Sequence, residues 1–234
     1  MLPREDAMSL SLLYHLNSEP WRVPDGDWRP QYKEAESGAI PLPAAIETGI
    51  ANLIRRRRSC RDFAPRELTA EDLAALLAGS YGITGISAGV YQRAAPSAGG
   101  LYPLETYVIT RACVAHYVPR DHALEPTASA PPPGELTACF YGQPWAEAAP
   151  AVIALTAVFE RTQAKYGPRG YRFALLEAGH VAQNICLLAE ERGLAAVCLG
   201  GFIDSRLNAL LGIDGRSEAA LYAVAAGYPL LHDR

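Results

Sequence analysis

The chain is organised around residues 165–192, which read KYGPRGYR followed by FALLEAGHVAQNICLLAEER. The first eight residues bring together one lysine, two tyrosines and two arginines, and their two glycines and one proline predict a loop. The next twenty, Phe173 to Arg192, form the strongest helical pattern in the sequence and predict a central buried helix. Reactive groups at the mouth of a rigid element are a suitable layout for an active site, so this stretch is the first candidate.

Composition limits the class of protein. Half of the 234 residues are hydrophobic and a fifth are charged, which is ordinary for a globular chain that buries a core. The net charge of −4 argues against a general nucleic-acid binder. The five cysteines form no CxxC pair, so neither a zinc knuckle nor a disulfide framework is predicted.

Two further features concern the compartment. The N-terminus carries acidic residues where a signal peptide has a basic and then an apolar run. The longest apolar run, Ala148 to Phe159, is shorter than the about 20 residues that span a bilayer. We therefore expect a reduced, cytoplasmic protein that binds neither membrane nor nucleic acid.

The periodic segments predict a single domain, residues 41–234, preceded by an N-terminal arm, residues 1–40. Helices are expected at Ser9–His15, Ala44–Arg57, after the cap Thr69, at Phe173–Arg192, and from the cap Asp204 to Leu211. Strands are expected at Thr106–Thr110, Val114–Val118 (at a sheet edge), Ala151–Phe159, Leu194–Leu199 and Ala219–Ala226. Ser80–Ala98 and Pro126–Gly134 are predicted to be connections. Interleaved helices and strands indicate an α/β or α+β fold.

An anion site is one interpretation of the run Arg57-Arg58-Ser59-Cys60-Arg61. Arginine offers a planar fork that binds phosphate through two hydrogen bonds, and serine adds a hydroxyl donor. The alternative is that these charges only complement the negative end of the preceding helix. Four consecutive arginines followed by Arg61 exceed that need, but the residues alone leave both interpretations open.

Two glycine motifs allow close approach of a ligand to the backbone. Pro96-Ser97-Ala98-Gly99-Gly100 precedes a predicted strand, and Gly200-Gly201-Phe202 follows another. The first motif is not a Walker loop, because no Gly-Lys-Ser/Thr follows it. It is not a dinucleotide-binding fingerprint either, because the spacing GxGxxG is absent. Taken alone, the first motif is favoured to be a wide turn before a strand, and the second is equally a tight turn between a strand and a helix.

Lys165 and Tyr166 place a cation beside a phenol, and either could act as a general acid or base. On chemistry alone a solvated loop is the favoured alternative. In the helix that follows, Glu177-x-x-His180 resembles half of a di-iron motif, but no second copy exists. We therefore expect Glu177, His180, Gln183 and Asn184 to form a buried polar face of the helix rather than a metal site.

In combination, the motifs RRSxR, PSAGGLYPLE, KYGxRGYR, LLEAGHVAQN, GGF and GYP resemble the FMN-dependent nitroreductase superfamily, and specifically its SagB-type thiazole/oxazole dehydrogenase branch. The likeness runs from Ile46 to Tyr228, and Leu13-Tyr14-His15-x-Asn17-Ser18 resembles the family's N-terminal YH segment. It implies a three-layer α+β fold, with a mostly antiparallel central sheet flanked by helices. It also implies an intertwined homodimer that binds FMN at its interface.

The resemblance further implies four groups of residues around FMN: an arginine–serine run, a glycine loop from the other subunit, a glycine turn whose N–H groups face flavin N5 and O4, and a positively charged residue near the C-terminus that completes the phosphate site. The groups are Arg57, Arg58, Ser59 and Arg61; Pro96, Ser97, Ala98 and Gly99; Leu199, Gly200 and Gly201; and Arg234. Lys165 and Tyr166 match a pair associated with azoline oxidation, in which a base removes the ring Cα proton, a hydride passes to flavin N5 and oxygen reoxidises the flavin. Arg169 and Arg172 are expected to brace the loop.

The expected function is therefore an FMN-dependent dehydrogenase that converts thiazoline or oxazoline rings to azoles in a ribosomal peptide or a carrier-bound natural product. One alternative is an FMN oxidoreductase for another small molecule, including an NAD(P)H-dependent nitroreductase-like activity. Another is a non-catalytic flavin-binding scaffold of a cyclodehydratase complex. One departure bears on the substrate: Arg111–Val118 leaves little room for the hairpin usual in the branch.

Overall fold

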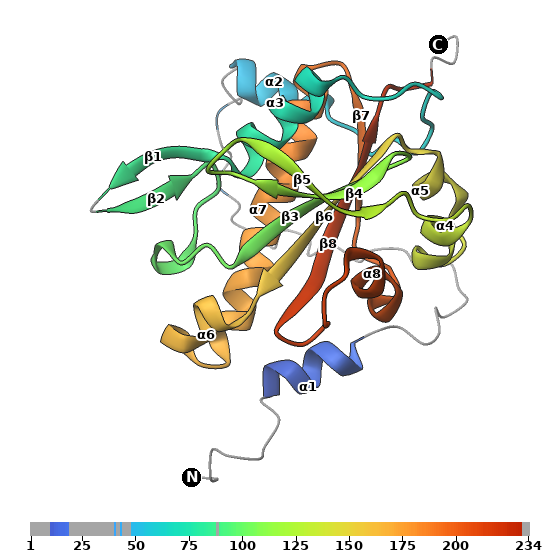
Figure 1. Ribbon diagram of the computed structural model, residues 1–234. Coiled ribbons are helices and arrows are strands. Elements are labelled where there is room, and N and C mark those ends of the chain that lie inside the picture. Colours follow the sequence, from blue (N-terminus) through green and yellow to red (C-terminus); the bar gives the residue numbers. More distant parts are fainter. Residues whose placement is uncertain (1–9, 19–39, 41–42, 44–47, 88, 231–234) are drawn as a thin grey trace.

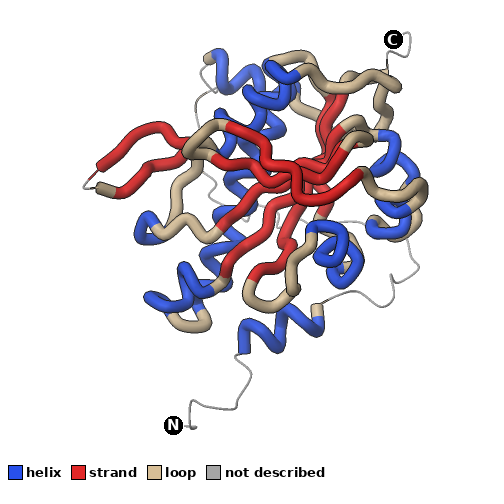
Figure 2. The backbone as a smooth tube through the Cα atoms, in the orientation of Figure 1, coloured by secondary structure: helices blue, strands red, loops and turns tan. Residues whose placement is uncertain are grey.

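The computed structural model describes residues 10–18, 40, 43, 48–87 and 89–230, and a six-stranded sheet lies at its centre (Figures 1 and 2). The strand order is β5-β4-β3-β6-β8-β7, and every neighbouring pair is antiparallel. The strands are β3 (Leu104–Thr110), β4 (Cys113–Val118), β5 (Ala123–Ser129), β6 (Ala151–Val158), β7 (Ala195–Leu199) and β8 (Glu218–Gly227).

Helices cover both faces of the sheet, because side chains alternate between the faces along each strand. In β6, Ile153 and Leu155 pack towards one set of helices, while Val152 and Ala154 pack towards the other set. The first set is α2 (Gly49–Arg56), α3 (Ala70–Tyr81) and α7 (Arg169–Glu191); the second is α4 (Glu135–Cys139), α5 (Pro144–Ala148) and α8 (Asp204–Leu211). The expected three-layer α+β fold with an antiparallel sheet is confirmed.

The long helix α7 is the central element of its layer, and α3 crosses it at close range. A Cβ atom placed on Gly79 of α3 would lie 2.8 Å from Leu188 Cδ1 of α7. Glycine at this position therefore lets the two helices approach each other, and the contact explains a glycine inside an otherwise regular helix.

The prediction of a loop over residues 165–172 is wrong for all but residues 167 and 168. Lys165 and Tyr166 end a short helix, α6 (Glu160–Tyr166), and α7 already begins at Arg169. Gly167 has a φ of 56° and ends α6, which leaves a two-residue turn between the helices. The lysine and tyrosine are therefore held by a helix rather than by a flexible loop.

Two expected connections contain strands. Ser80–Ala98 includes the hairpin of β1 (Ile83–Ser87) and β2 (Val90–Arg93), which projects from the body in Figure 1. β4 is not at the edge of the sheet, because β5 pairs with it and takes that place. Pro126 lies in β5, where an edge strand tolerates a residue without an N–H group. The β4–β5 pair also forms a hairpin after Thr110, where the sequence suggested little room for one.

Helix caps were predicted with mixed success. Thr69 caps α3 as expected, since its Oγ1 accepts a hydrogen bond from the Asp72 N–H at 3.1 Å. Asp204 instead lies in the first turn of α8, and Ile203 is the N-cap residue. α2 begins at Gly49 after the cap Thr48, and residues 44–47 of the expected helix lie outside the described residues.

Most of the N-terminal arm, residues 1–40, also lies outside the described residues, apart from α1 (Leu10–Asn17), residue 18 and residue 40. α1 extends past the predicted end at His15, whose Nδ1 is 3.1 Å from the Tyr171 hydroxyl of α7. Across the described part of the chain, no helix combines the length and apolar character that crossing a membrane requires.

Candidate functional site

Lys165 and Tyr166 lie against Gly99, a residue far away in the sequence. A Cβ atom placed on Gly99 would be 2.5 Å from the Tyr166 hydroxyl and 3.0 Å from Lys165 Nζ. Gly99 has a φ of 66°, in the left-handed region that glycine adopts readily. Two motifs that were predicted separately, PSAGG and the lysine–tyrosine pair, therefore meet within one chain.

Arg161 fastens the helix that carries this pair. Its Nη2 lies 2.5 Å from Glu105 Oε1 of β3, and its Nη1 donates to the Tyr102 carbonyl at 3.2 Å. Glu105 also accepts from His116 Nε2 at 2.8 Å. Burial raises the pKa of Glu105, but the His116 hydrogen bond and the Arg161 charge outweigh it and hold the pKa below its usual value. α6 is thus fixed to both ends of the Tyr102–Glu105 segment.

A buried polar group supports the glycine loop from behind. The Tyr81 hydroxyl of α3 donates to Glu177 Oε1 of α7 at 2.5 Å, and the Tyr102 N–H donates to Ser97 Oγ at 2.9 Å. The Arg93 guanidinium stacks 4.4 Å above the Tyr81 ring. Burial raises the pKa of Glu177, and the Ser97 and Tyr81 hydroxyls and the Arg93 charge offset it only in part. This group holds Ser97 in place beside Gly99.

The arginine–serine run lies along the outer edge of β7. Ser59 bridges to Ala196, and the Cys60 N–H donates to the Ala196 carbonyl at 3.1 Å. Arg58 Nη1 donates to the carbonyls of Arg55 and Arg57 at 2.7 and 2.9 Å, so this guanidinium caps α2. The helix-terminal interpretation therefore applies to Arg58, while Arg57 and Arg61 stay candidates for an anion.

The glycine turn after β7 is exposed to solvent. Gly200 and Gly201 both lie at the surface, whereas Leu199 is buried in the core and can offer only its backbone. The Tyr222 ring packs against Gly200, because a Cβ atom there would be 3.4 Å from Tyr222 Cε2. The turn fits a planar ring that needs backbone donors and no side chain in the way.

The arginine run and the lysine–tyrosine pair lie at opposite ends of α7, as the positions of α2 and α6 in Figure 1 illustrate. Arg56 Nε is 3.2 Å from Glu190 Oε1 in the last turn of α7, whereas Tyr166 precedes its first turn. A helix of 23 residues is about 34 Å long at about 1.5 Å per residue. One small ligand cannot contact both groups within a single chain.

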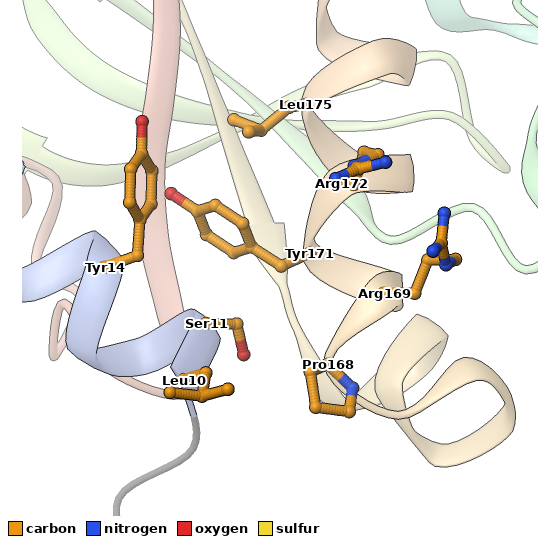
Figure 3. A pocket seen from close by; sticks show the side chains of 8 residues that line it. All are labelled: Leu10, Ser11, Tyr14, Pro168, Arg169, Tyr171, Arg172 and Leu175. Carbon is orange, nitrogen blue, oxygen red and sulfur yellow. The ribbon is translucent and has the colours of Figure 1, made fainter.

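A groove runs between α1 and the first turns of α7 (Figure 3). Its cavity of about 570 Å³ is lined by Leu10, Ser11, Tyr14, Pro168, Arg169, Tyr171, Arg172 and Leu175. The rings of Tyr14 and Tyr171 stand 5.9 Å apart, edge to face. A smaller cavity of about 230 Å³ shares Tyr14, Tyr171 and Leu175 with it and reaches Gly200. The surface is therefore hollowed from the α7 N-terminus to the glycine turn.

Two expectations about α7 are corrected. Arg169 and Arg172 are exposed and make no hydrogen bond or ion pair with another described residue, and the bracing falls to Arg161. Glu177 is buried while His180 and Gln183 are exposed, because steps of three residues fall behind the helical repeat of about 3.6. Asn184, which donates to the Ser80 carbonyl at 3.2 Å, lies partly buried. The described residues contain no group of three His, Cys, Asp or Glu side chains suited to a metal.

Several supporting residues escaped the sequence reasoning. The motif PSAGGLYPLE ends in Glu105 but assigns it no role, and the sequence predicts no role for Arg161, Tyr81 or Arg93. The charges of Glu105 and Arg161, which lie near the ends of predicted strands, were the available indication, but pairing them needs the strand register. Arg234, the positively charged residue expected to complete the phosphate site, lies outside the described residues.

Comparison with known proteins adds an independent line of argument. The chain matches the model of the nitroreductase family over residues 54–228. It is 35% identical over 180 residues to MJ1384, a candidate nitroreductase of Methanocaldococcus jannaschii, covering 74% of this chain and 89% of the relative. It is 31% identical over 144 residues to the microcin B17-processing protein McbC of Escherichia coli, covering 57% of this chain and 53% of McbC. The sequence alignment thus spans about half the length of McbC.

Solved structures show the same fold. A candidate nitroreductase of Ralstonia eutropha superposes with a TM-score of 0.70 at 24% identity, over 90% of this chain and 99% of that one. A chain of the E. coli microcin synthetase McbBCD complex, with truncated pro-MccB17 bound, superposes with a TM-score of 0.68 at 24% identity, over 99% and 85%. A Desulfovibrio desulfuricans protein in complex with FMN gives a TM-score of 0.58 at 22% identity, over 80% and 89%.

Proposed function

The chain belongs to the nitroreductase family, and on this premise we propose that it is an FMN-dependent dehydrogenase of the SagB/McbC-like branch. Its substrates would be thiazoline or oxazoline rings in a ribosomal peptide or a carrier-bound natural product. The observation that carries the proposal is the contact of Lys165 and Tyr166 with Gly99. A dehydrogenase needs a base for the ring proton, whereas a reductase supplied by a nicotinamide does not. The relative McbC, which processes microcin B17, supports this choice.

The residues present fit FMN as the cofactor. Family members typically bind FMN, and one structural neighbour contains it. Arg57, Ser59 and Arg61 would hold the phosphate, ribityl chain and pyrimidine edge, since two guanidinium groups and a hydroxyl suit an anionic, polar ligand. The backbone of Leu199 and the exposed turn of Gly200 and Gly201 would offer N–H groups to the flavin ring, where negative charge develops on reduction.

When bound, FMN would supply the two-electron acceptor for the reaction. Lys165 would take the proton from the ring carbon, and Tyr166 beside it would donate to the substrate or relay the proton. Pro96, Ser97, Ala98 and Gly99 would bring backbone close to the flavin. Arg161 and Glu105 would act indirectly, because they fix the helix that presents the base.

A homodimer would bring the arginine run and the Lys165–Tyr166 pair together, although they lie at opposite ends of α7 within one chain. Pairing two α7 helices antiparallel would bring the Lys165 end of one copy towards the Arg57 end of the other. Large apolar side chains are exposed on α2 and α7: Ile50, Ile54, Leu175 and Leu176.

We also propose that residues 41–234 form one domain. By analogy with the McbBCD complex, we propose that the enzyme works beside a cyclodehydratase.

The direct test replaces Lys165 by alanine and supplies a precursor peptide whose azolines are already formed. Loss of the base should abolish azole formation, a fall of at least about 10²-fold, while flavin absorbance stays unchanged. Arg169→Ala is the matched control, because it removes a nearby exposed cation that has no described partner. Azole formation by Lys165→Ala at the wild-type rate would contradict the assignment.

A second function is favoured by the likeness to MJ1384, namely an NAD(P)H-dependent reduction of a small molecule. Comparing wild type with Lys165→Ala distinguishes the dehydrogenase from the reductase. If NAD(P)H-driven reduction of a nitroaromatic compound is fast and equal in wild type and Lys165→Ala, and azolines are untouched, the reductase replaces the dehydrogenase.

A further inference from the structure

Two of the five cysteines meet inside the molecule. Cys186 of α7 and Cys198 of β7 are both free thiols, and their Sγ atoms lie 3.5 Å apart. A disulfide needs a separation of about 2.05 Å, so an approach of about 1.5 Å would join them. Neither Cys60, Cys113 nor Cys139 contacts another thiol among the described residues.

The two thiols are unequal in a way that suits stepwise oxidation. Hydrogen bonding to Cys186 holds the pKa of Cys198 below its usual value, and the Tyr222 hydroxyl and the Arg57 charge act in the same direction. The same hydrogen bond raises the pKa of Cys186. Cys198 is partly exposed, whereas Cys186 is 4% exposed. The more exposed of the two residues therefore carries the more acidic thiol, and the second thiol lies 3.5 Å from it.

We propose that Cys186 and Cys198 form a reversible dithiol–disulfide site that reacts with peroxides. The Cys198 thiolate attacks one oxygen of hydrogen peroxide, the O–O bond breaks, and the departing hydroxide takes up the proton that Cys198 lost on ionising and becomes water. Cys198 is then a sulfenic acid. The Cys186 sulfur attacks it, the S–S bond forms, and hydroxide leaves with the Cys186 proton as a second water. The two thiols together supply the two electrons that reduce one molecule of hydrogen peroxide to two waters.

The site is adjacent to the residues proposed for FMN. Cys198 precedes Gly200 by two residues, and the Tyr222 ring that packs against Gly200 also contacts Cys198. Arg57 is the cation that acts on both sulfurs. Oxidation prevents Cys198 from carrying a negative charge near Arg57, so the disulfide form should bind the phosphate of FMN more tightly. This consequence rests on the proposed function, which also supplies hydrogen peroxide whenever oxygen reoxidises the flavin.

The first experiment tests the thiol pair alone. The reduced full chain is treated with one equivalent of hydrogen peroxide and analysed by intact mass and peptide mapping. The expected result is a loss of two hydrogens, a Cys186–Cys198 cross-link, and full reversal by dithiothreitol. Cys198→Ser and Cys186→Ser should each prevent the cross-link, and Cys60→Ser, the matched control, should leave it unchanged. Thermal melting confirms folding, and Cys198→Ser alone suffices if the buried Cys186→Ser variant does not fold.

In the first experiment, a gain of oxygen at Cys198 without a cross-link overturns the proposal. Oxidation of another residue before Cys186 and Cys198 also overturns it.

The second experiment titrates FMN into reduced and oxidised protein and follows binding by fluorescence. We expect roughly two- to five-fold tighter binding after oxidation, as for one partly exposed charge pair, and no difference in Arg57→Ala. Equal affinities would overturn the link to Arg57. Absence of FMN binding in both states would instead remove the proposed function, while the mapping still decides the thiol pair.

Discussion

Gly99 is the residue through which two distant parts of the sequence make one site. Its left-handed φ and its contact with Tyr166 and Lys165 both require the absence of a side chain. The motif PSAGG could be recognised from sequence, and so could the lysine–tyrosine pair. Their contact could not, because it depends on where β3 and β6 leave the sheet: Leu104 at the start of β3 pairs with Ala157 near the end of β6.

Replacing Gly99 by alanine should therefore do two kinds of damage. The positive φ costs about 1 kcal/mol in stability, and the new methyl group displaces the Tyr166 hydroxyl, so azole formation should fall at least about tenfold. Gly134→Ala is the matched control, because Gly134 has a φ of 85° and open space around its Cβ position. Denaturant unfolding and steady-state rates measure the two effects. Equal losses of activity in both variants would show that only backbone strain matters.

At the scale of elements, Glu177 joins the two helices that cover one face of the sheet. It carries a buried carboxylate on α7 and accepts a hydrogen bond from Tyr81 of α3. Burial raises the pKa of Glu177 above its unfolded value. The native state therefore binds this proton more tightly, so its contribution to stability is complete below pH 4.5, the unfolded value, and is lost as the pH rises through the native pKa.

Glu177→Gln should remove this pH dependence and keep an acceptor for Tyr81. Relative to wild type, the variant should gain on the order of 1 kcal/mol in unfolding free energy between acidic and neutral pH. Glu177→Ala should instead lose about 2 kcal/mol at neutral pH, because the Tyr81 hydroxyl is left buried without its acceptor. Urea unfolding at both pH values measures this. If the Glu177→Gln variant instead loses stability relative to wild type as the pH rises, the sign of the Glu177 pKa shift is contradicted.

The helices and strands predicted best were those whose formation depends on residues next to one another in the sequence. Thr69 caps α3 through its own side chain, and the apolar run of β6 needs no partner to be recognised. The hairpin β1–β2 was missed because its residues show no apolar alternation and are largely exposed. The start of α7 is earlier than predicted, because Gly167 and Pro168 favour a long loop in the sequence but only separate two helices in the structure.

At the scale of the whole molecule, the fold separates the two halves of the proposed site. The motifs predicted that Arg57 and Lys165 both serve one flavin, but no motif states how far apart they lie. Their placement at opposite ends of the 23-residue α7 makes a second copy of the chain the natural source of the missing half. The exposed leucines of α7 are suited to such an interface. The central proposal is that the chain is an FMN-dependent dehydrogenase whose site is shared between two copies.

The most direct test of this claim is complementation between two inactive variants, Lys165→Ala and the double variant Arg57→Ala with Arg61→Ala. In a mixed dimer, one site combines the intact arginines of one copy with the intact lysine of the other. Random pairing makes half of the dimers mixed, with one of two sites restored, so azole formation should return to about a quarter of the wild-type rate. A mixture that stays as inactive as its two components would place the whole site within one chain and contradict the account.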